Sequence, residues 1–204
     1  DIVPGAQWRK LGVPGEEEFA GRGVSYCATC DGPFYRDKNV VVIGGGDTAL
    51  QEALFLTHSA RKVTVVHRRD RLRAADILQK RAAAQKKIEF VWKANLAQIV
   101  GKELVSAVKL KDVESGKISE LPADGVFVFV GRIPQTEIFR DVLKLDNAGY
   151  ILTDDNMHTS AAGIFAAGDC RAKQFRQVIT AAGDGANAIY SAELYIAALK
   201  GESY

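Results

Sequence analysis

The sequence predicts an α/β fold built on a doubly wound parallel sheet with an inserted β-meander. Between residues 40 and 92, short runs of β-branched residues alternate with helical patterns, and a glycine-rich turn follows the first run. A hairpin pattern then occupies residues 105–121. Continuous apolar runs are typical of strands buried on both faces, and their alternation with helices is typical of parallel sheets.

The sheet begins with Val40–Ile43, a β-branched run bounded by polar residues, which predicts a buried strand. Apolar residues at helical spacing then predict a helix that ends at about Ser59. Val63–Val66 predicts a second buried strand, and residues 74–87, rich in strong helix formers, predict a second helix. Residues 88–92 continue the series as the next parallel strand.

The later elements change in character along the chain. Val105–Val113 and Lys117–Leu121 flank a Glu-Ser-Gly turn and predict an antiparallel hairpin, and Gly125–Val130 predicts another buried strand. A polar, turn-rich stretch, a short strand with a turn, and a long helix are then expected at residues 146–162, 163–169 and 177–199. The first 26 residues mix Pro and Gly with short apolar pieces and predict strand ends and loops.

The composition is that of a globular protein, with 47% hydrophobic and 25% charged residues, which argues against a disordered chain. The longest apolar runs have only strand length, so we expect no membrane span, and we find no signal-peptide pattern. The net charge is +2, yet residues 61–87 hold ten Lys and Arg against two acids. One basic segment predicts a local anionic ligand rather than a nucleic-acid surface.

A dinucleotide-binding fingerprint, Gly44-x-Gly46-x-x-Ala49, joins the first strand to the first helix. Gly44 permits the tight turn, Gly46 lets the backbone approach a pyrophosphate, and Ala49 lets the helix pack closely on the sheet. Asp47 and Thr48 begin the helix, whose free N–H groups attract phosphate. This context predicts a Rossmann-like nucleotide site; the alternative is a plain glycine-rich turn.

The end of the second strand indicates which nucleotide binds. An NAD site places an acid near this point to bind the ribose hydroxyls. This chain instead has His67, Arg68 and Arg69, with Arg73 at the start of the next helix. Guanidinium groups match a 2′-phosphate, so the pattern predicts NADPH; the alternative is a solvated basic helix start.

Cys27 and Cys30 form a C-x-x-C pair, which indicates either redox chemistry or a metal site. Zinc needs further ligands, but Cys170 is 140 residues away and the three histidines form no paired motif. We therefore expect no metal, and a pair that cycles between dithiol and disulfide. Asp31 follows Cys30 within reach of a thiolate proton; the alternative is a turn former before Gly32.

Together, these motifs resemble the low-molecular-weight, bacterial-type thioredoxin reductases over nearly all 204 residues. The resemblance rests on Cys-Ala-Thr-Cys-Asp-Gly, Gly-Gly-Gly-Asp-Thr-Ala, His-Arg-Arg-x-x-x-Arg and Gly-Ile-Phe-Ala-Ala-Gly-Asp, in this order. It implies an enzyme that depends on NADPH and FAD. It also implies that electrons pass from NADPH through FAD and the Cys27–Cys30 pair to the disulfide of thioredoxin.

The resemblance further implies roles for single residues. Cys27 is expected to attack the partner disulfide, Cys30 to lie next to the flavin, and Asp31 to act as the acid and base. Arg22 matches a thioredoxin-docking position, with a plain surface arginine as the alternative, and Cys170 is expected to be a small buried residue. The implied FAD-binding residues are the ribityl-binding pair and the start of the last helix: Gly168, Asp169, Arg176, Gln177 and Val178. Gly131, where the chain crosses between domains, is also expected to contact a cofactor.

One departure from the family pattern concerns the flavin. The family opens with a first Gly-x-Gly-x-x-Gly unit for the ADP part of FAD, which is absent here, so we expect about 100 residues to be missing. We expect residues 1–9 to be a hinge and the end of a truncated FAD domain. Residues 10–131 then form the NADPH-binding domain with the C-x-x-C, and residues 132–204 the C-terminal part of the FAD-binding, Rossmann-like domain.

The resemblance also implies a homodimer in the cytoplasm, with no nucleic-acid or membrane partner. Three alternatives stay open for the function. The chain could belong to the flavin subunit of a peroxiredoxin reductase system or to a ferredoxin-linked enzyme, although the three arginines disfavour the latter. It could also be a non-catalytic NADPH-binding or redox-sensing module.

Overall fold

In the computed structural model, which describes residues 2–202, the chain divides into two compact units. One unit is continuous and comprises Arg9–Gly131. The other combines the chain up to Trp8 with the chain from Arg132 onward. The backbone therefore passes between the units twice, once at each end of the continuous unit.

The continuous unit is built on a five-stranded sheet in which every neighbouring pair of strands is parallel. The strand order is β2-β9-β3-β4-β5, with bounds Val24–Ser25, Gly125–Val128, Asn39–Ile43, Lys62–Val66 and Ile88–Val91. Two helices alternate with the strands, α2 (Asp47–Leu56) after β3 and α3 (Asp76–Ala84) after β4. The predicted doubly wound α/β fold class is confirmed.

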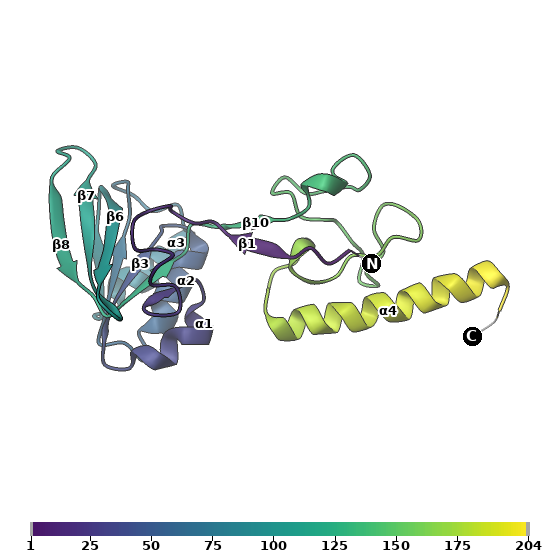
Figure 1. Cartoon of the computed structure of the whole chain (residues 1–204), viewed down its shortest axis with the longest axis horizontal. Coiled ribbons are helices and arrows are strands. Elements are labelled where there is room, and N and C mark those ends of the chain that lie inside the picture. Colours follow the sequence, from purple (N-terminus) through teal and green to yellow (C-terminus); the bar gives the residue numbers. More distant parts are fainter. Residues whose placement is uncertain (1, 203–204) are drawn as a thin grey trace. The chain divides into compact units, whose positions relative to one another are not determined.

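A three-stranded antiparallel sheet is inserted between β5 and β9, in the order β6-β7-β8 (Figure 1). Its strands are Ala94–Gly101, Val105–Asp112 and Ile118–Pro122. The sequence predicts β7 and β8 as a hairpin but does not predict β6. Register shifts at Leu96/Gln98 and at Val100/Gly101 interrupt the alternation of β6, so its pattern does not keep the period of two.

Both helices are shorter than their sequence patterns, and hydrogen bonds explain the difference. After α2, the Thr57 hydroxyl donates to the Leu54 carbonyl at 2.6 Å, which closes the last turn before Ser59. Before α3, the backbone N–H of Ala75 donates to a carboxylate oxygen of Asp47 at 2.7 Å and Ala75 is extended. A contact between distant residues thus decides where α3 begins.

Apolar side chains form one core on each face of the parallel sheet. On β3, Val40 and Val42 pack into the core that α2 and α3 cover, whereas Val41 and Ile43 pack into the core that the meander covers. This alternation follows from the two-residue period of a strand. Both faces of the sheet are therefore buried, as the continuous apolar runs predict.

The second unit has less regular structure. A two-stranded antiparallel ribbon pairs β1 (Ala6–Trp8) with β10 (Arg132–Pro134), as Figure 1 shows. The helix α4 (Val178–Lys200) confirms the predicted long helix, and Gly201 ends it in the left-handed conformation with φ +71°. Short helical turns complete both units: α1 (Ala28–Asp31), η1 (Gly32–Tyr35), η2 (Glu137–Phe139) and η3 (Gly168–Cys170). Within residues 2–202, no helix has the length and apolar character needed to cross a bilayer.

Candidate functional site

The turn between β3 and α2 fixes Gly44 and Gly45 through packing inside the protein. Gly44 has φ +152°, and a Cβ there would lie 2.6 Å from the Phe129 carbonyl oxygen and 2.7 Å from the Cβ of Ala49. A Cβ on Gly45 would lie 2.3 Å from a ring nitrogen of His67. Neither position accepts a side chain, because backbone or a buried ring fills the space.

Gly46 is different, because a Cβ there would meet no protein atom within 4 Å. Its φ of −99° is open to any residue, and it is the N-cap of α2 without a side-chain capping hydrogen bond. The protein itself therefore does not require glycine at this position. The open space would allow a ligand to approach the backbone closely, and the uncapped N–H groups of the first helical turn suit phosphate.

The arginine loop is joined to this glycine turn by its main chain. The backbone N–H of Arg73 donates to the Gly45 carbonyl at 2.8 Å, and the Asp47 carboxylate holds Ala75. Arg68, Arg69 and Arg73 are exposed, and no ion pair engages them among the residues that the structure describes. Three guanidinium groups thus lie on the loop tied to the helix N-terminus and suit an anion.

His67 is buried beneath Gly45, with 6% of its surface exposed. Burial lowers the pKa of its imidazole, a backbone hydrogen bond at Arg71 partly offsets this, and the neighbouring arginines lower it further. The ring is therefore neutral near pH 7. Its Nε2 is buried and has no hydrogen-bond partner within residues 2–202. His67 thus supports the turn by packing, and it offers no charge to a phosphate.

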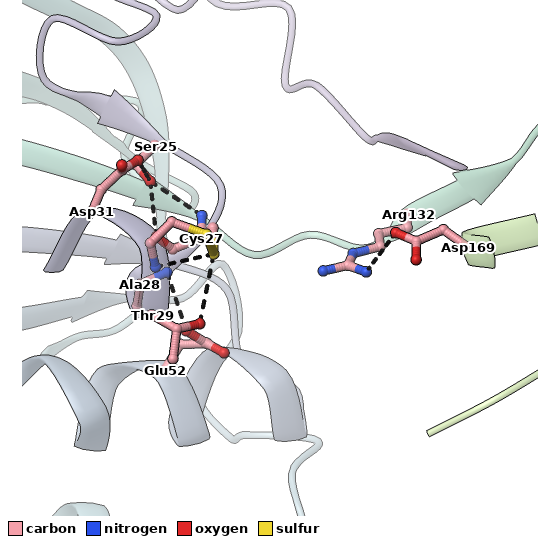
Figure 2. Close-up of a disulfide and its surroundings, with 9 residues drawn as sticks. Ser25, Cys27, Ala28, Thr29, Asp31, Glu52, Arg132 and Asp169 are labelled. Carbon is pink, nitrogen blue, oxygen red and sulfur yellow. Dashed lines mark hydrogen bonds and ion pairs between the residues drawn. A yellow bond between two sulfur atoms is a disulfide. The ribbon is translucent and has the colours of Figure 1, made fainter. Parts of the chain in front are cut away.

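Cys27 and Cys30 are joined by a disulfide at the start of α1, directly after β2 (Figure 2). The Cys27 sulfur accepts a hydrogen bond from the backbone N–H of Cys30 at 3.2 Å. Cys27 is half-buried, whereas Cys30 is exposed. The sulfur bond leaves neither residue as a thiolate ligand, and no group of three or more His, Cys, Asp or Glu able to hold a metal occurs in the described chain.

Ser25 connects the disulfide to the acid that follows it (Figure 2). Its hydroxyl donates to Asp31 at 2.6 Å and accepts the backbone N–H of Cys27 at 3.1 Å. On the other side, the Glu52 carboxylate of α2 accepts the backbone N–H of Ala28 at 3.2 Å. Sequence reasoning missed Ser25 and Glu52. No sequence pattern marks Ser25, because the first 26 residues predict only strand ends and loops, yet the residue is 4% exposed.

The second unit contains the predicted Gly168–Asp169 pair. Gly168 is left-handed with φ +81°, and Asp169 follows it in η3. One Asp169 carboxylate oxygen lies 3.6 Å from the Arg132 guanidinium, and the other is buried without a hydrogen-bond partner in the described structure (Figure 2). The Arg132 guanidinium also stacks 3.9 Å from the ring centroid of Trp8, its partner across the β1–β10 ribbon.

The start of α4 presents further polar groups. Gln177 and Thr180 cap each other reciprocally, and Val178 is exposed. The Arg176 guanidinium lies 3.9 Å from the ring centroid of Tyr150, and its Nε is buried without a partner among residues 2–202. Cys170 is fully buried, and burial raises the pKa of its thiol, so it is an inert packing residue.

The structure brings the predicted residues together in two groups. The glycine turn, the arginines and the cysteine pair lie in the continuous unit, as does exposed Arg22, which donates to the Glu18 carbonyl. Asp169 and the residues that begin α4 lie in the other unit. Gly131, with φ +112°, is the last residue of the continuous unit and accepts the N–H of Arg9 at 3.0 Å.

Comparison with known proteins places the chain among disulfide oxidoreductases. Residues 2–185 match the family model described as pyridine nucleotide-disulphide oxidoreductase. A thioredoxin reductase of Treponema pallidum is 53% identical over 199 residues, and one of Listeria monocytogenes is 50% identical over 200 residues. Each match covers 98% of this chain but only 64% and 63% of the relative, respectively. The chain thus spans less than two thirds of these relatives.

Solved structures give the same result. The crystal structure of thioredoxin reductase from Streptococcus pyogenes matches 97% of this chain with a TM-score of 0.92 and 49% identity. A thioredoxin reductase from Giardia duodenalis matches 96% of the chain with a TM-score of 0.90 and 41% identity. The chain covers 65% of each of these two structures.

Proposed function

We propose that this chain, which belongs to the pyridine nucleotide-disulphide oxidoreductase family, is the NADPH-binding and disulfide-bearing part of a thioredoxin reductase. The observation that carries the proposal is the open space at Gly46, beside an arginine loop and in the same unit as a C-x-x-C disulfide. The substrates of the complete enzyme are NADPH and the disulfide of thioredoxin.

The residues present fit NADPH. Gly46 leaves room for the pyrophosphate at the N-terminus of α2, and Arg68, Arg69 and Arg73 supply the charge that a 2′-phosphate requires. An acid in their place would favour NADH. We therefore assign the arginines to coenzyme selection and the glycine turn to phosphate binding.

The second unit fits part of an FAD site. Buried polar atoms are nearly always paired in proteins, yet one oxygen of Asp169 and the Nε of Arg176 are buried without partners in the described structure. These groups suit the hydroxyls and polar ring edge of a flavin. We propose that Asp169 binds the ribityl chain, and that Gln177 and Val178 begin a helix against the ring.

Bound NADPH would supply a hydride, and bound FAD would carry its two electrons to the disulfide of this chain. The Cys27–Cys30 disulfide accepts these two electrons and two protons and becomes a dithiol, and Asp31 holds one proton near the sulfurs. The N–H of Cys30 favours a thiolate on Cys27.

Cys27 then attacks the disulfide of thioredoxin, and a mixed disulfide forms as one thioredoxin sulfur leaves as a thiolate. Cys30 attacks the Cys27 sulfur, which releases reduced thioredoxin and restores the disulfide. We propose that Trp8–Arg9 and Gly131–Arg132, where the backbone passes between units, are hinges that let the flavin serve both partners. Cytoplasmic location and a homodimer remain predictions from the family resemblance.

Cysteine variants of the full-length gene product test the disulfide step. Cys27→Ser and Cys30→Ser should each abolish NADPH-dependent thioredoxin reduction, while electron transfer from NADPH to an artificial flavin oxidant continues. Cys170→Ser is the matched control and should keep thioredoxin reduction, because Cys170 is buried away from solvent. Thioredoxin reduction by Cys30→Ser at the wild-type rate would refute the proposal. Reduction of a peroxiredoxin-system disulfide instead would favour that alternative.

Trapping experiments identify the attacking thiol. Cys30→Ser should accumulate a mixed disulfide with thioredoxin through Cys27, and Cys27→Ser should not. The opposite result would assign the attack to the more exposed Cys30.

Arginine variants test coenzyme selection. Arg68→Gln and Arg73→Gln should each raise the KM for NADPH about tenfold to a hundredfold, since one charge-assisted phosphate contact is worth about 1.5–3 kcal/mol, and leave the KM for NADH unchanged. Arg71→Gln, from the same exposed loop, is the control and should change neither value. Equal changes for NADPH and NADH would rule out 2′-phosphate recognition.

A further inference from the structure

A largely buried carboxylate that the proposed mechanism does not use lies in the second turn of α4. Asp184 accepts the backbone N–H of Gly168 at 3.0 Å, the Arg171 guanidinium at 2.8 Å and the Lys173 ammonium at 2.8 Å. Its side chain is only 12% exposed. Burial opposes its ionisation, but Lys173, Arg171 and the Gly168 N–H outweigh this effect and lower the pKa of the carboxyl.

The partners of Asp184 are themselves anchored. The Arg171 guanidinium also donates to the Thr153 hydroxyl at 2.8 Å and to the Asp154 carbonyl at 3.3 Å. Lys173 lies 3.3 Å from the hydroxyl of Thr180, the residue that caps α4 together with Gln177. One ionic network therefore connects η3, the segment that follows it and the first two turns of α4.

This network joins the two elements assigned to the flavin. The Gly168 N–H fixed by Asp184 immediately precedes Asp169, whose buried oxygen has no partner in the described chain. Thr180 and Gln177 form the cap at the other element. Stability alone does not call for such a network, because buried ion pairs add little over apolar packing. A need to hold two ligand-binding elements in a fixed position relative to each other would explain the network.

We propose that Asp184 is a positioning residue for flavin binding. It holds the Gly168–Asp169 turn and the N-terminus of α4 in one arrangement, so that both elements are preorganised for FAD binding. The inference rests on the proposed function, since it presumes that Asp169 and the start of α4 face FAD. Asp184 itself acts through Asp169 and does not touch the cofactor.

The experiment measures FAD affinity by flavin fluorescence in the full-length gene product. Asp184→Asn keeps an acceptor for Gly168 but removes the charge, and it should weaken FAD binding about tenfold or more, as expected for the loss of charge-assisted hydrogen bonds. Asp155→Asn, an exposed aspartate of the same unit, is the matched control and should bind FAD like the wild type. Unchanged FAD affinity in Asp184→Asn would overturn the inference.

A double-mutant cycle separates positioning from general destabilisation. In an Asp169→Asn background, Asp184→Asn should weaken FAD binding by no more than about twofold, because its effect passes through Asp169. An undiminished loss in that background would overturn the inference. Should Asp184→Asn fail to fold, Lys173→Gln replaces it in the same cycle. A loss of FAD affinity seen only when Asp169 is intact supports the inference, and an equal loss in the Asp169→Asn background overturns it. Absence of FAD binding by the wild type would instead refute the proposed function.

Discussion

The two units differ in how they cover their apolar surface. Arg9–Gly131 has a core on each face of its sheet, and these cores contain most of the fully buried side chains. In the described part of the other unit, buried apolar residues form two small clusters of four residues each. Its helix α4 leaves several large apolar side chains exposed in the described structure: Val178, Ile179, Ile189, Tyr190, Ile196 and Leu199.

The comparison indicates that the continuous unit supplies its own folding free energy. Burial of apolar surface is the main favourable term in folding, and this unit buries both faces of a sheet. The second unit buries less apolar surface, and polar networks and the long helix α4 make up much of its structure. A set of substitutions can test this difference.

The largest expected effect is a cavity in the continuous unit. Phe127→Ala should lower the free energy of unfolding by about 3–5 kcal/mol, because Phe127 is fully buried and packs against Tyr35 and Phe129. Chemical denaturation measures the change. Phe165→Ala, in a small cluster of the other unit, should cost less, and Ile138→Ala, 81% exposed, should cost below about 0.5 kcal/mol. An equal loss of unfolding free energy for Phe127→Ala and Phe165→Ala would contradict the proposed difference between the two units.

A smaller effect distinguishes two neighbouring glycines of the continuous unit. Gly45→Ala should destabilise it by about 1–3 kcal/mol, because the added methyl would overlap the His67 ring. Gly46→Ala should change stability by less than about 1 kcal/mol, since its Cβ meets open space, yet weaken NADPH binding about tenfold or more. Thermal unfolding and NADPH titration separate the two effects. Normal NADPH affinity in Gly46→Ala would show that the space serves no ligand.

The smallest effect is a pH dependence in the same unit. The pKa of His67 is lowered on folding, chiefly by burial, so the unfolded chain binds a proton more readily. Stability should therefore be fully present above the unfolded pKa of about 6.5 and decline as pH falls toward the folded pKa, by no more than about 1.4 kcal/mol per pH unit. Denaturation curves between about pH 7.5 and about pH 5 measure this slope. His67→Gln should remove it, and His58→Gln, at an exposed site, should not.

Local patterns allow much of this structure to be predicted. The β3 strand, the glycine turn and α4 are predictable because their signals lie within one contiguous segment. The β6 strand is not, since its bulges break the period of two, and the start of α3 depends on Asp47, 28 residues before Ala75. The same limit applies to the candidate site. The roles of Glu52 and Asp184 could not be predicted, because each accepts a backbone hydrogen bond from a residue that only the fold brings close.

The hydrogen bond from Arg73 to Gly45 has a consequence for how coenzyme preference can evolve. It is a main-chain bond, so this tie between the arginine loop and the glycine turn does not use the guanidinium groups. Exchanging the guanidinium groups for acids therefore alters the charge offered to the coenzyme without dismantling the scaffold that presents it. Under the proposed assignment of the arginines, selectivity for one coenzyme could therefore change while this main-chain bond stays in place.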